Sequence, residues 1–572
     1  MWPNITWVFI ATFMFATSLQ TTNAKMTIEN RNKLIHAMTT ELFEPAFLPK
    51  GPDRLVVKIS KNANHCYEDL RAIERLQAAT INDLSNIIYL SDIRAIPNLD
   101  FLKELPRDEL FSIFMPHHQR LASKLINLLM EVGDVDEMLQ RAYCIRDKTN
   151  PGLFVYALSF VLVHRPDCRS LKMRSLAHIF PGNFIKSSEL EVAQHQMTID
   201  IINQKDETVV EQPFDFSGND LDPEHWLSYF REDVFMNLHH WHWHIWYPFI
   251  DPKNASNIPV VDKDRRGELF YYMHQQVIAR YNFERLSNRL PFVEPFDDLK
   301  NPIADGYYSK LNQGLGSKPW AGRPKNLQFQ NLNRYEFKIS VQDLLRWKNR
   351  ILDAIIQGKV RKADNTEIEL NANTGINILG NMVESSVLSV NKKFYGDLHN
   401  MMHVFTALSH DPDGRFNEDM GVMGETSTAM RDPAFYKVHA MVDNIFNSFK
   451  ETLPPYTVPE LNFPAVEVTS ISLQSDQSDV LNKLETHWEK FTISLNRSLD
   501  FLGEPNGNHI VSIKTDRLQH VPFQYNIKCL ILEADQCKGL CAFSWHRNTT
   551  TVMWQLILPS KEDCSLNLTG SK

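Results

Sequence analysis

The feature that most constrains this chain is an arrangement of three histidines that occurs twice. In the first copy His240 and His244 lie four residues apart, so a helix places both imidazoles on one face, one turn apart. Their neighbours His239 and His242 point elsewhere on such a helix. His274 follows on a second amphipathic helical pattern farther along the chain. The first copy therefore predicts two helices that bring three imidazoles together.

The second copy repeats this arrangement with different spacing between its helices. His399 and His403 again lie four residues apart, and His439 follows on a later helical pattern. Two such helix pairs predict a four-helix bundle with two metal ions at its centre. A single histidine on an apolar helix is more often a core residue bonded to the backbone. The repetition in aromatic surroundings favours metal ligands over that alternative.

The composition of the ligand set narrows the choice of metal. Six neutral imidazoles without a thiolate or carboxylate suit copper, although a three-histidine set also suits catalytic zinc. A redox-active copper pair binds O₂ between its ions, and zinc does not. The spacing of the histidines alone leaves both metals open.

Composition sets the scale of the fold and excludes some partners. With 572 residues, of which 43% are hydrophobic, the chain can bury several cores and is not a disordered protein. The 60 basic and 69 acidic residues give a net charge of −9, without the basic excess that a phosphate-binding surface needs. Nucleic acid is therefore not an expected partner.

The patterns along the chain predict a multidomain α+β protein. Residues 25–190 are expected to form a helical N-terminal domain, with helical patterns at Pro106–Phe114 and along the leucines from Leu121 to Leu129. Long aromatic helices across residues 191–455 would form the four-helix bundle with its metal pair. Alternating runs such as Val466–Ile471 predict a β-rich, sandwich-like domain over residues 456–572.

The first 24 residues predict a signal peptide. An apolar stretch, Trp7–Ala16, is followed by small polar residues that end in Thr22-Asn23-Ala24, although no Lys or Arg precedes the stretch. A membrane anchor would need a longer apolar span. We therefore expect cleavage after Ala24 and a secreted, extracellular protein without a membrane segment.

Cysteines and glycosylation motifs agree with secretion. The chain has seven cysteines, an odd number that leaves at least one thiol free or intermolecular. Their pairing is open, but the clustering of four near the C-terminus fits disulfides in that region: Cys529, Cys537, Cys541 and Cys564. Four motifs predict N-glycosylation: Asn254, Asn496, Asn548 and Asn567.

Long segments around the histidines resemble arthropod prophenoloxidases and their hemocyanin relatives. The segments are Tyr229–Asp233, Asn237–His244, Asp264–His274, Tyr395–His403, Gly421–Gly424 and Thr428–His439, and the resemblance runs from about residue 44 to about residue 523. It implies a type 3 copper pair. The resemblance assigns His240, His244 and His274 to one copper, and His399, His403 and His439 to the other. Complete ligand sets argue against the hexamerins, storage relatives that have lost them.

Two departures from the insect zymogens concern control of activity. Those zymogens are cleaved after an Arg-Phe dipeptide near the N-terminus, whereas Arg-Phe occurs here at Arg415-Phe416, within the expected copper domain. The chain also ends about 50 residues past Leu518, so we expect a shortened third domain without the glycine- and cysteine-rich motif of the family. Whether activation by cleavage is needed stays open.

The function implied by the resemblance is that of a phenoloxidase. Such an enzyme uses O₂ to hydroxylate monophenols and to oxidise catechols to o-quinones, which polymerise towards melanin. Glu418 and Glu425 are candidates for the base that deprotonates a phenol, or are solvated loop carboxylates. Phe111 or Phe114 is a candidate for the side chain that plugs the copper pocket in relatives, or is an ordinary core residue.

Two other functions use the same histidines. A hemocyanin-like oxygen carrier would deny phenols access to the coppers, and a secreted binding or decoy protein would be catalytically weak because of its short third domain. The sequences of the motifs around His274 and His439 are more similar to the phenoloxidase branch than to the oxygen carriers. Phenolic small molecules and O₂ are the expected partners. The preferred phenol, the tissue and homo- or hetero-oligomer formation are left open.

Overall fold

The computed structural model of the protein describes most of the chain between residues 25 and 570. The described ranges are 25–39, 56–59, 87–90, 99–213, 216–217, 221–250, 252, 261–313, 318–462, 466–475, 480–495, 509–531, 538–543, 552–557 and 564–570.

The N-terminal part is built from short helices around an apolar core. Helix α5 is apolar on nearly every face and is buried, and it starts at Asn150, whose side chain accepts a hydrogen bond from the Leu153 N–H. Leucines on α3, from Leu121 to Leu129, form the predicted buried stripe. A parallel strand pair, β1 with β2, adds to this part. The bounds are α1 (Ile28–Met38), β1 (Val56–Ile59), β2 (Ile87–Leu90), α3 (Pro116–Met130), α4 (Val135–Ile145), α5 (Pro151–His164), α6 (Leu176–Ile179) and α7 (Ser187–Ile202).

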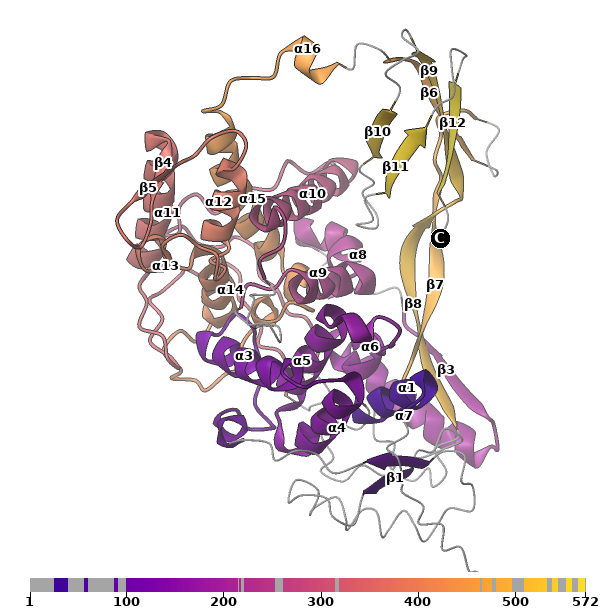
Figure 1. Ribbon diagram of the computed structural model, residues 1–572. Coiled ribbons are helices and arrows are strands. Elements are labelled where there is room, and N and C mark those ends of the chain that lie inside the picture. The colour runs from indigo at the N-terminus through magenta and orange to yellow at the C-terminus, as the bar shows by residue number, and fades with distance from the viewer. Residues whose placement is uncertain are drawn as a thin grey trace, which may run out of the picture.

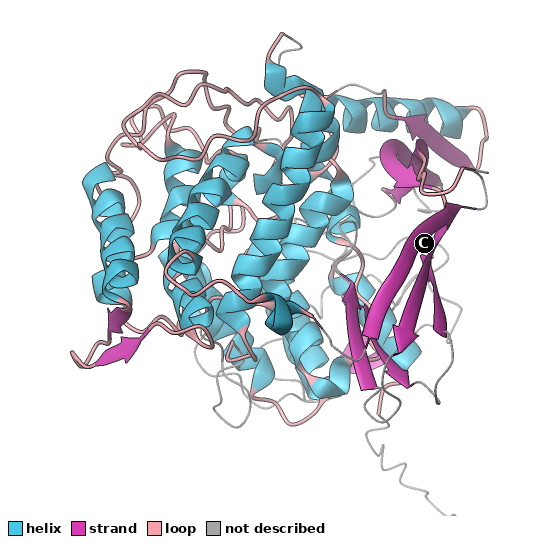
Figure 2. Ribbon diagram, turned by 90° about the horizontal axis from the view of Figure 1, so that it is seen from above, coloured by secondary structure: helices cyan, strands magenta, loops and turns pink. Residues whose placement is uncertain are grey.

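The middle of the chain forms the predicted helical bundle. Four of its helices, α9, α10, α14 and α15, carry the six histidines, and α11 and α12 pack against them (Figures 1 and 2). The bounds are α8 (Ser228–Arg231), α9 (Val234–Trp246), α10 (Arg266–Ser287), α11 (Val341–Gln357), β4 (Lys359–Arg361), β5 (Glu367–Glu369), α12 (Gly375–Val383), α13 (Lys392–Tyr395), α14 (Leu398–Leu408) and α15 (Pro433–Lys450).

Capping residues fix where two of the histidine helices begin. The Asp233 carboxylate accepts from the Met236 N–H at the start of α9, and the Asp432 carboxylate accepts from the Ala434 N–H at the start of α15. Pro433 occupies the first turn of α15, where its missing N–H removes no helical bond. The ends of these helices thus fix the register of the histidines they carry.

A buried ion pair joins three elements at the end of the bundle. Arg266, at the start of α10, pairs with Glu384, which directly follows α12, and neither side chain is more than 1% exposed. The Arg266 guanidinium also donates to the Pro248 carbonyl beyond α9. Because a lone buried charge is costly, each partner requires the other.

The C-terminal part is β-rich, as predicted. It lies to one side of the helices, and its strands form three sheets (Figure 1). Phe491 of β7 packs on Phe235 of α9, with ring centroids 4.6 Å apart. The bounds are α16 (Val458–Leu461), β6 (Val466–Ser475), β7 (Thr486–Ser494), β8 (Ile510–His520), β9 (Phe523–Ile531), β10 (Lys538–Phe543), β11 (Val552–Ile557) and β12 (Cys564–Gly570).

One strand connects this part to an earlier region of the chain. Strand β3 (Glu207–Glu211) directly follows the turn after α7 and pairs in parallel with β8, and β8 pairs antiparallel with β7. The other sheets are β12-β9-β6 and the pair β10-β11. Helix α7 continues through the expected domain boundary at residue 190. The domain boundaries remain predictions from the sequence.

The expected helix at Pro106–Phe114 is wrong. Beyond a short 3₁₀ helix at Asp100–Glu104, residues 105–115 form turns and irregular backbone until α3 begins at Pro116. We call residues 107–115 the strap. Its apolar spacing resembled a helix face because Phe111 and Phe114 are both buried, but they contact different surroundings instead of one helix face.

Several expectations concern residues that the structure does not describe. The predicted signal peptide, Asn254, Asn496 and Asn548 lie outside the described residues. Asn567 lies in β12, at the register position opposite Asn526 of β9.

The cysteines can be placed in part. Cys144 is disulfide-bonded, and Cys168 is a buried free cysteine, in agreement with the odd count. Cys564 and Cys529 occupy opposite register positions in β12 and β9.

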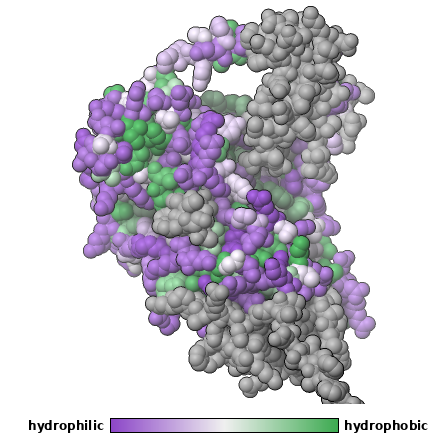
Figure 3. Space-filling view, viewed as in Figure 1, coloured by the Kyte–Doolittle hydropathy of each residue, from purple (hydrophilic) through white to green (hydrophobic). Residues whose placement is uncertain are grey.

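The described surface is mainly hydrophilic on the face shown in Figure 3, with hydrophobic side chains gathered over part of the helical region. Among the helices that the structure describes, none combines the length and apolar character needed to cross a membrane.

Two glycines allow α10 and α12 to touch backbone to backbone, which generates a stability prediction. A Cβ at Gly380 would lie 1.9 Å from the Gly267 carbonyl oxygen. We expect Gly380→Ala to lower the free energy of unfolding by at least ~2 kcal/mol, because neither backbone can yield. Gly133→Ala is the matched control, since its Cβ would meet no atom closer than 4.0 Å. Equal thermal midpoints for the two variants would contradict this account of the helix contact.

Candidate metal centre

The bundle brings all six predicted histidines into one buried cluster. Their exposure ranges from 0 to 2%, and each lies on the helix expected for it. Rings from the two halves of the sequence face each other, since His274 stacks on His439 with centroids 4.3 Å apart. His240 is parallel to His403 within 18°, with centroids 6.3 Å apart. His242, by contrast, is exposed, as the helix geometry predicted.

Backbone carbonyls orient four of the six rings. The Nδ1 atoms of His274 and His439 lie 2.8 Å from the carbonyl oxygens of Phe270 and Phe435, one turn earlier on the same helices. A carbonyl oxygen only accepts, so each Nδ1 carries the proton. Each Nε2 is therefore left with a free lone pair, the form in which imidazole binds a metal.

The other two of these rings share one loop, residues 421–428, between α14 and α15. His240 Nδ1 donates to the Thr426 carbonyl at 2.7 Å, and His403 Nδ1 donates to the Met423 carbonyl at 3.0 Å. One histidine from each predicted triad is therefore oriented by the same short segment. We call residues 421–428 the orienting loop.

A fifth ring is oriented by a side chain. Asn400 donates through Nδ2 to the Glu384 carbonyl at 2.9 Å, which leaves its Oδ1 to accept from His399 Nδ1 at 3.2 Å. The Nδ1 of His244 has no hydrogen-bond partner among the described residues. Hydrogen bonding thus turns five of the six Nε2 atoms into acceptors.

The spacing of these acceptor atoms fits metal ions. The Nε2 atoms of His240 and His244 are 3.1 Å apart, and so are those of His399 and His439. With Nδ1 protonated, the two nitrogens of the second pair would direct lone pairs at each other, which is repulsive unless a cation lies between them. An ion about 2.0 Å from both nitrogens would subtend an angle of roughly 100°, as in a four-coordinate site.

The ligand atoms lie close enough for His274 to belong to either cluster. Those of His240, His244 and His274 lie within 4.8 Å of one another, and so do those of His274, His399 and His439. His403 joins through its position on α14: its ring centroid is 4.8 Å from that of His399, and its Nε2 has no hydrogen-bond partner among the described residues. All six rings thus line one compact centre.

Burial keeps the rings in the neutral form that binds metals. Burial and neighbouring histidines lower the pKa of His274 and of His403 to about 3. The same causes hold the pKa of the other four rings well below its usual value near 6.5. Uncharged imidazoles close together can bind a cation without first losing protons.

Of the two candidate plug residues, Phe114 is the one that contacts the cluster. Its ring stacks on His403 with centroids 4.2 Å apart and planes 11° from parallel, and it meets His244 edge-on at 6.0 Å. Phe249 also stacks on Phe114, with centroids 6.1 Å apart. Phe111 instead contacts His118 and Tyr156. The strap therefore inserts one aromatic ring from the N-terminal part into the metal centre.

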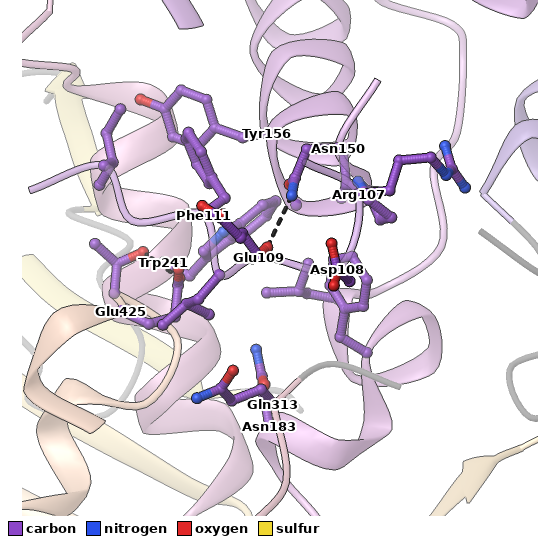
Figure 4. A pocket seen from close by; sticks show the side chains of 18 of the residues that line it. Arg107, Asp108, Glu109, Phe111, Asn150, Tyr156, Asn183, Trp241, Gln313 and Glu425 are labelled. Carbon is purple, nitrogen blue, oxygen red and sulfur yellow. Dashed lines mark hydrogen bonds between the residues drawn. The ribbon is translucent and has the colours of Figure 1, made fainter. Parts of the chain in front are cut away.

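The two candidate carboxylates lie in different environments. Glu418 is exposed, and its carboxylate approaches His410 at 3.6 Å. Glu425 lies in the orienting loop, where its Oε1 accepts from the Ser427 N–H and the Thr426 hydroxyl. Burial raises the Glu425 pKa to about 7, and its carboxylate lies beside Trp241 at a cavity (Figure 4). Glu425 thus has the environment of a tuned base.

Comparisons with known proteins agree with this geometry. Residues 175–446 match the family described as hemocyanin, copper containing domain, residues 58–170 match the hemocyanin all-alpha domain, and residues 455–540 match the hemocyanin ig-like domain. Phenoloxidase 2 of Drosophila melanogaster is 45% identical over 487 residues, which cover 85% of this chain and 69% of that protein. The chain belongs to the hemocyanin and phenoloxidase family.

Other members of this family show similar sequences and folds. Phenoloxidase subunit 1 of Manduca sexta is 40% identical over 85% of this chain and 69% of its own length. A crystal structure of a crustacean hemolymph-type prophenoloxidase superposes with a TM-score of 0.77 at 27% identity, over 95% of this chain and 82% of the other. An activated-state scorpion hemocyanin gives a TM-score of 0.70 at 35% identity, over 82% and 75% of the two chains.

Family membership resolves the choice of metal. A hemocyanin copper domain with two histidine triads forms a type 3 dicopper site, so the ions are copper and not zinc. The observed Nε2 geometry accommodates two such ions. Glu418 is exposed, Phe114 contacts the histidines of this site, and Glu425 lines the cavity beside it.

Sequence reasoning missed the groups that orient the copper ligands. Met423 and Thr426 act through their carbonyls, which carry no side-chain signal. Asn400 had a signal that could have been used, because it directly follows His399 in the sequence and a ligand histidine needs an acceptor for its second ring N–H. Ser112 of the strap was also missed; its hydroxyl donates to the Gly424 carbonyl at 2.6 Å.

The dicopper site generates a prediction on metal content. We expect His403→Ala to retain at most about one copper per chain, because two imidazoles hold a copper ion more weakly than three. His242→Ala, on the exposed side of α9, should keep the full two. Elemental analysis of the purified proteins measures both. Two tightly held coppers in His403→Ala would exclude His403 as a ligand.

Proposed function

We propose that this protein is a copper-dependent phenoloxidase that oxidises catechols to o-quinones and hydroxylates monophenols with O₂. The observation that carries the proposal is the cluster of six buried histidines, together with the half-buried Glu425 carboxyl, whose pKa is raised to about 7. The similarity to phenoloxidases of Drosophila and Manduca supports it. When bound, the copper pair supplies the O₂ activation and electron exchange that this oxidation requires.

The chain's own residues position the phenol and move its proton. Glu425, as carboxylate, accepts the phenol proton and holds it at its side chain. The Ser427 N–H and the Thr426 hydroxyl fix that carboxylate. Burial raises the pKa of Tyr156 of α5, and the nearby Glu425 charge adds to this rise. The apolar rings of Phe114 and Phe249 keep water away from the histidines.

Phe114 determines whether a phenol reaches the coppers. Its ring is fully buried and occupies the face of His403 on which an aromatic substrate would stack. A permanently seated Phe114 fits the alternative function, an oxygen carrier that excludes phenols. A catechol assay separates the two functions, because a carrier produces no o-quinone.

Removal of this ring should raise activity. We expect Phe114→Ala to oxidise catechol at least about tenfold faster than the unmodified chain, which is itself measurably active before any proteolysis. Copper content should not change. The cavity should cost roughly 3 kcal/mol of stability. Phe111→Ala is the comparison, because that ring contacts none of the six histidines. If untreated protein is silent and one N-terminal cut restores full activity, control lies in cleavage and not in Phe114.

The raised pKa of Glu425 predicts a pH dependence. Below about pH 7 its carboxyl is mostly protonated and cannot accept a proton, so monophenol hydroxylation should fall as pH drops through 7. Glu425→Gln should lower the rate by about 10²-fold or more and remove that inflection. Glu418→Gln, on the exposed carboxylate, should change neither. A pH profile with the same inflection in Glu425→Gln would assign the base to another group.

We also propose that the protein is secreted. The apolar stretch at Trp7–Ala16, the odd number of cysteines with Cys144 in a disulfide, and the glycosylation motifs support this. The mature chain should begin near Lys25 and carry glycan on at least one of Asn254, Asn496, Asn548 and Asn567. N-terminal sequencing of protein from its native source tests the cleavage, and a chain that begins at Met1 would contradict it.

A further inference from the structure

A cavity lies between the strap and α5 on one side and the copper domain on the other. It has a volume of about 220 Å³ and receives side chains from both parts of the chain, including Phe111 of the strap, Tyr156 of α5 and Trp241 of α9 (Figure 4). None of the six histidines lines it, and neither does Phe114. The cavity therefore adjoins the dicopper site without containing its ligands, because Trp241 is next to His240 on α9 and the Thr426 carbonyl orients His240.

The walls fit a single aromatic ring. Besides Phe111, Tyr156 and Trp241, the lining includes Phe180 and the aliphatic side chains of Val155 and Leu176. An apolar cavity of roughly 150 Å³ suffices to bind benzene in a protein interior. The volume here admits one benzene ring with a small substituent.

Polar residues also line this mainly apolar cavity, namely Arg107, Asp108, Glu109, Asn150, Asn183, Lys318 and Thr426. Two further polar side chains, Gln313 and Glu425, come from separate loops. Gln313 is 8% exposed, and its Nε2 has no hydrogen-bond acceptor among the described residues. Its main-chain N–H donates to the Lys318 carbonyl at 2.9 Å, which fixes the position of the residue. Glu425 enters from the orienting loop. A buried amide donor without a partner is costly, so a ligand that accepts from it gains binding energy.

The occupant of the cavity would touch the parts that control the coppers. Phe111 lies three residues before Phe114 on the strap, and the Ser112 hydroxyl holds the strap to the Gly424 carbonyl of the orienting loop. Thr426, which also lines the cavity, orients His240 through its carbonyl. A ligand here would thus lie against both the strap and the orienting loop.

We propose that this cavity is a binding site for one phenol molecule outside the dicopper site, where the phenol oxygen accepts from Gln313 and its hydroxyl donates to Glu425. It holds the substrate beside the strap before the substrate reaches the histidines. The choice of phenol rests on the proposed phenoloxidase function. The presence of a donor and an acceptor distinguishes phenol from an apolar ring of the same size, such as toluene.

Calorimetric titration of the copper-loaded protein with phenol tests the proposal. Oxygen is excluded, so that the phenol does not react. We expect Gln313→Leu to weaken phenol binding by about five- to tenfold, the loss expected for one hydrogen bond. Toluene should bind more weakly than phenol to the unmodified protein and about equally to both proteins. Gln328→Leu is the control, because its exposed amide donates to the Lys300 carbonyl away from the cavity.

A second variant and a kinetic readout guard against a folding defect. Gln313→Met retains the length of the side chain without its donor, and it should weaken phenol binding to the same extent. Both Gln313 variants should keep two coppers and raise the KM for a monophenol, with kcat nearly unchanged. Phenol binding that is equal in the unmodified protein and both variants would overturn the proposed site. Absence of quinone formation in fully copper-loaded Phe114→Ala would instead overturn the proposed function.

Discussion

The dicopper site depends on hydrogen bonds from imidazole Nδ1 atoms to oxygen acceptors. Each of these bonds sets one tautomer and aims one Nε2 inward, so the site is organised by the backbone as much as by the ligands. Two acceptors are carbonyls of the histidine helices themselves, at Phe270 and Phe435. Two others, at Met423 and Thr426, belong to the orienting loop. Both halves of the centre therefore share a single piece of irregular backbone.

That loop also connects the copper ligands to the rest of the protein. It carries Glu425, which lines the cavity beside the strap. Its Gly424 carbonyl accepts a hydrogen bond from the Ser112 hydroxyl of the strap. The strap in turn inserts Phe114 against His403. Ligand orientation, proton acceptance and access to the pocket thus depend on one contact surface between the N-terminal part and the bundle.

The helices and ligands could be predicted because they obey a short-range rule. The four-residue spacing of His240 and His244 fixes their common face whatever surrounds the helix, and the same holds for His399 and His403. Metal identity could not be obtained from spacing, since three imidazoles suit copper and zinc alike. The β-rich character of the C-terminal part followed from alternation, but no local signal indicated that β3 would pair with β8 from so far along the chain.

At the strap and at the two carboxylates, the local sequence pattern did not predict the structure. Phe111 and Phe114 have the spacing of a helix face, yet the backbone there is irregular and the two rings contact different neighbours. Only tertiary contacts distinguish them. Glu418 and Glu425 lie in one connection, and burial separates a surface ion pair from a carboxyl with a raised pKa.

The parallel pairing of β3 with β8 has a consequence for how the protein comes apart. Strand β3 precedes the helical bundle in the sequence, yet it pairs with β8, which follows the bundle. This pairing holds the β-rich C-terminal part to the preceding part at a distance from the covalent connection between α15 and β6. A protease that cuts between α15 and β6 would nick the chain without releasing a fragment. If the C-terminal part detached, β3 and β8 would expose unpaired backbone N–H and C=O groups, which can pair with strands of other chains. The C-terminal part is therefore not an independent domain joined by a linker alone, because strand pairing also holds it in place.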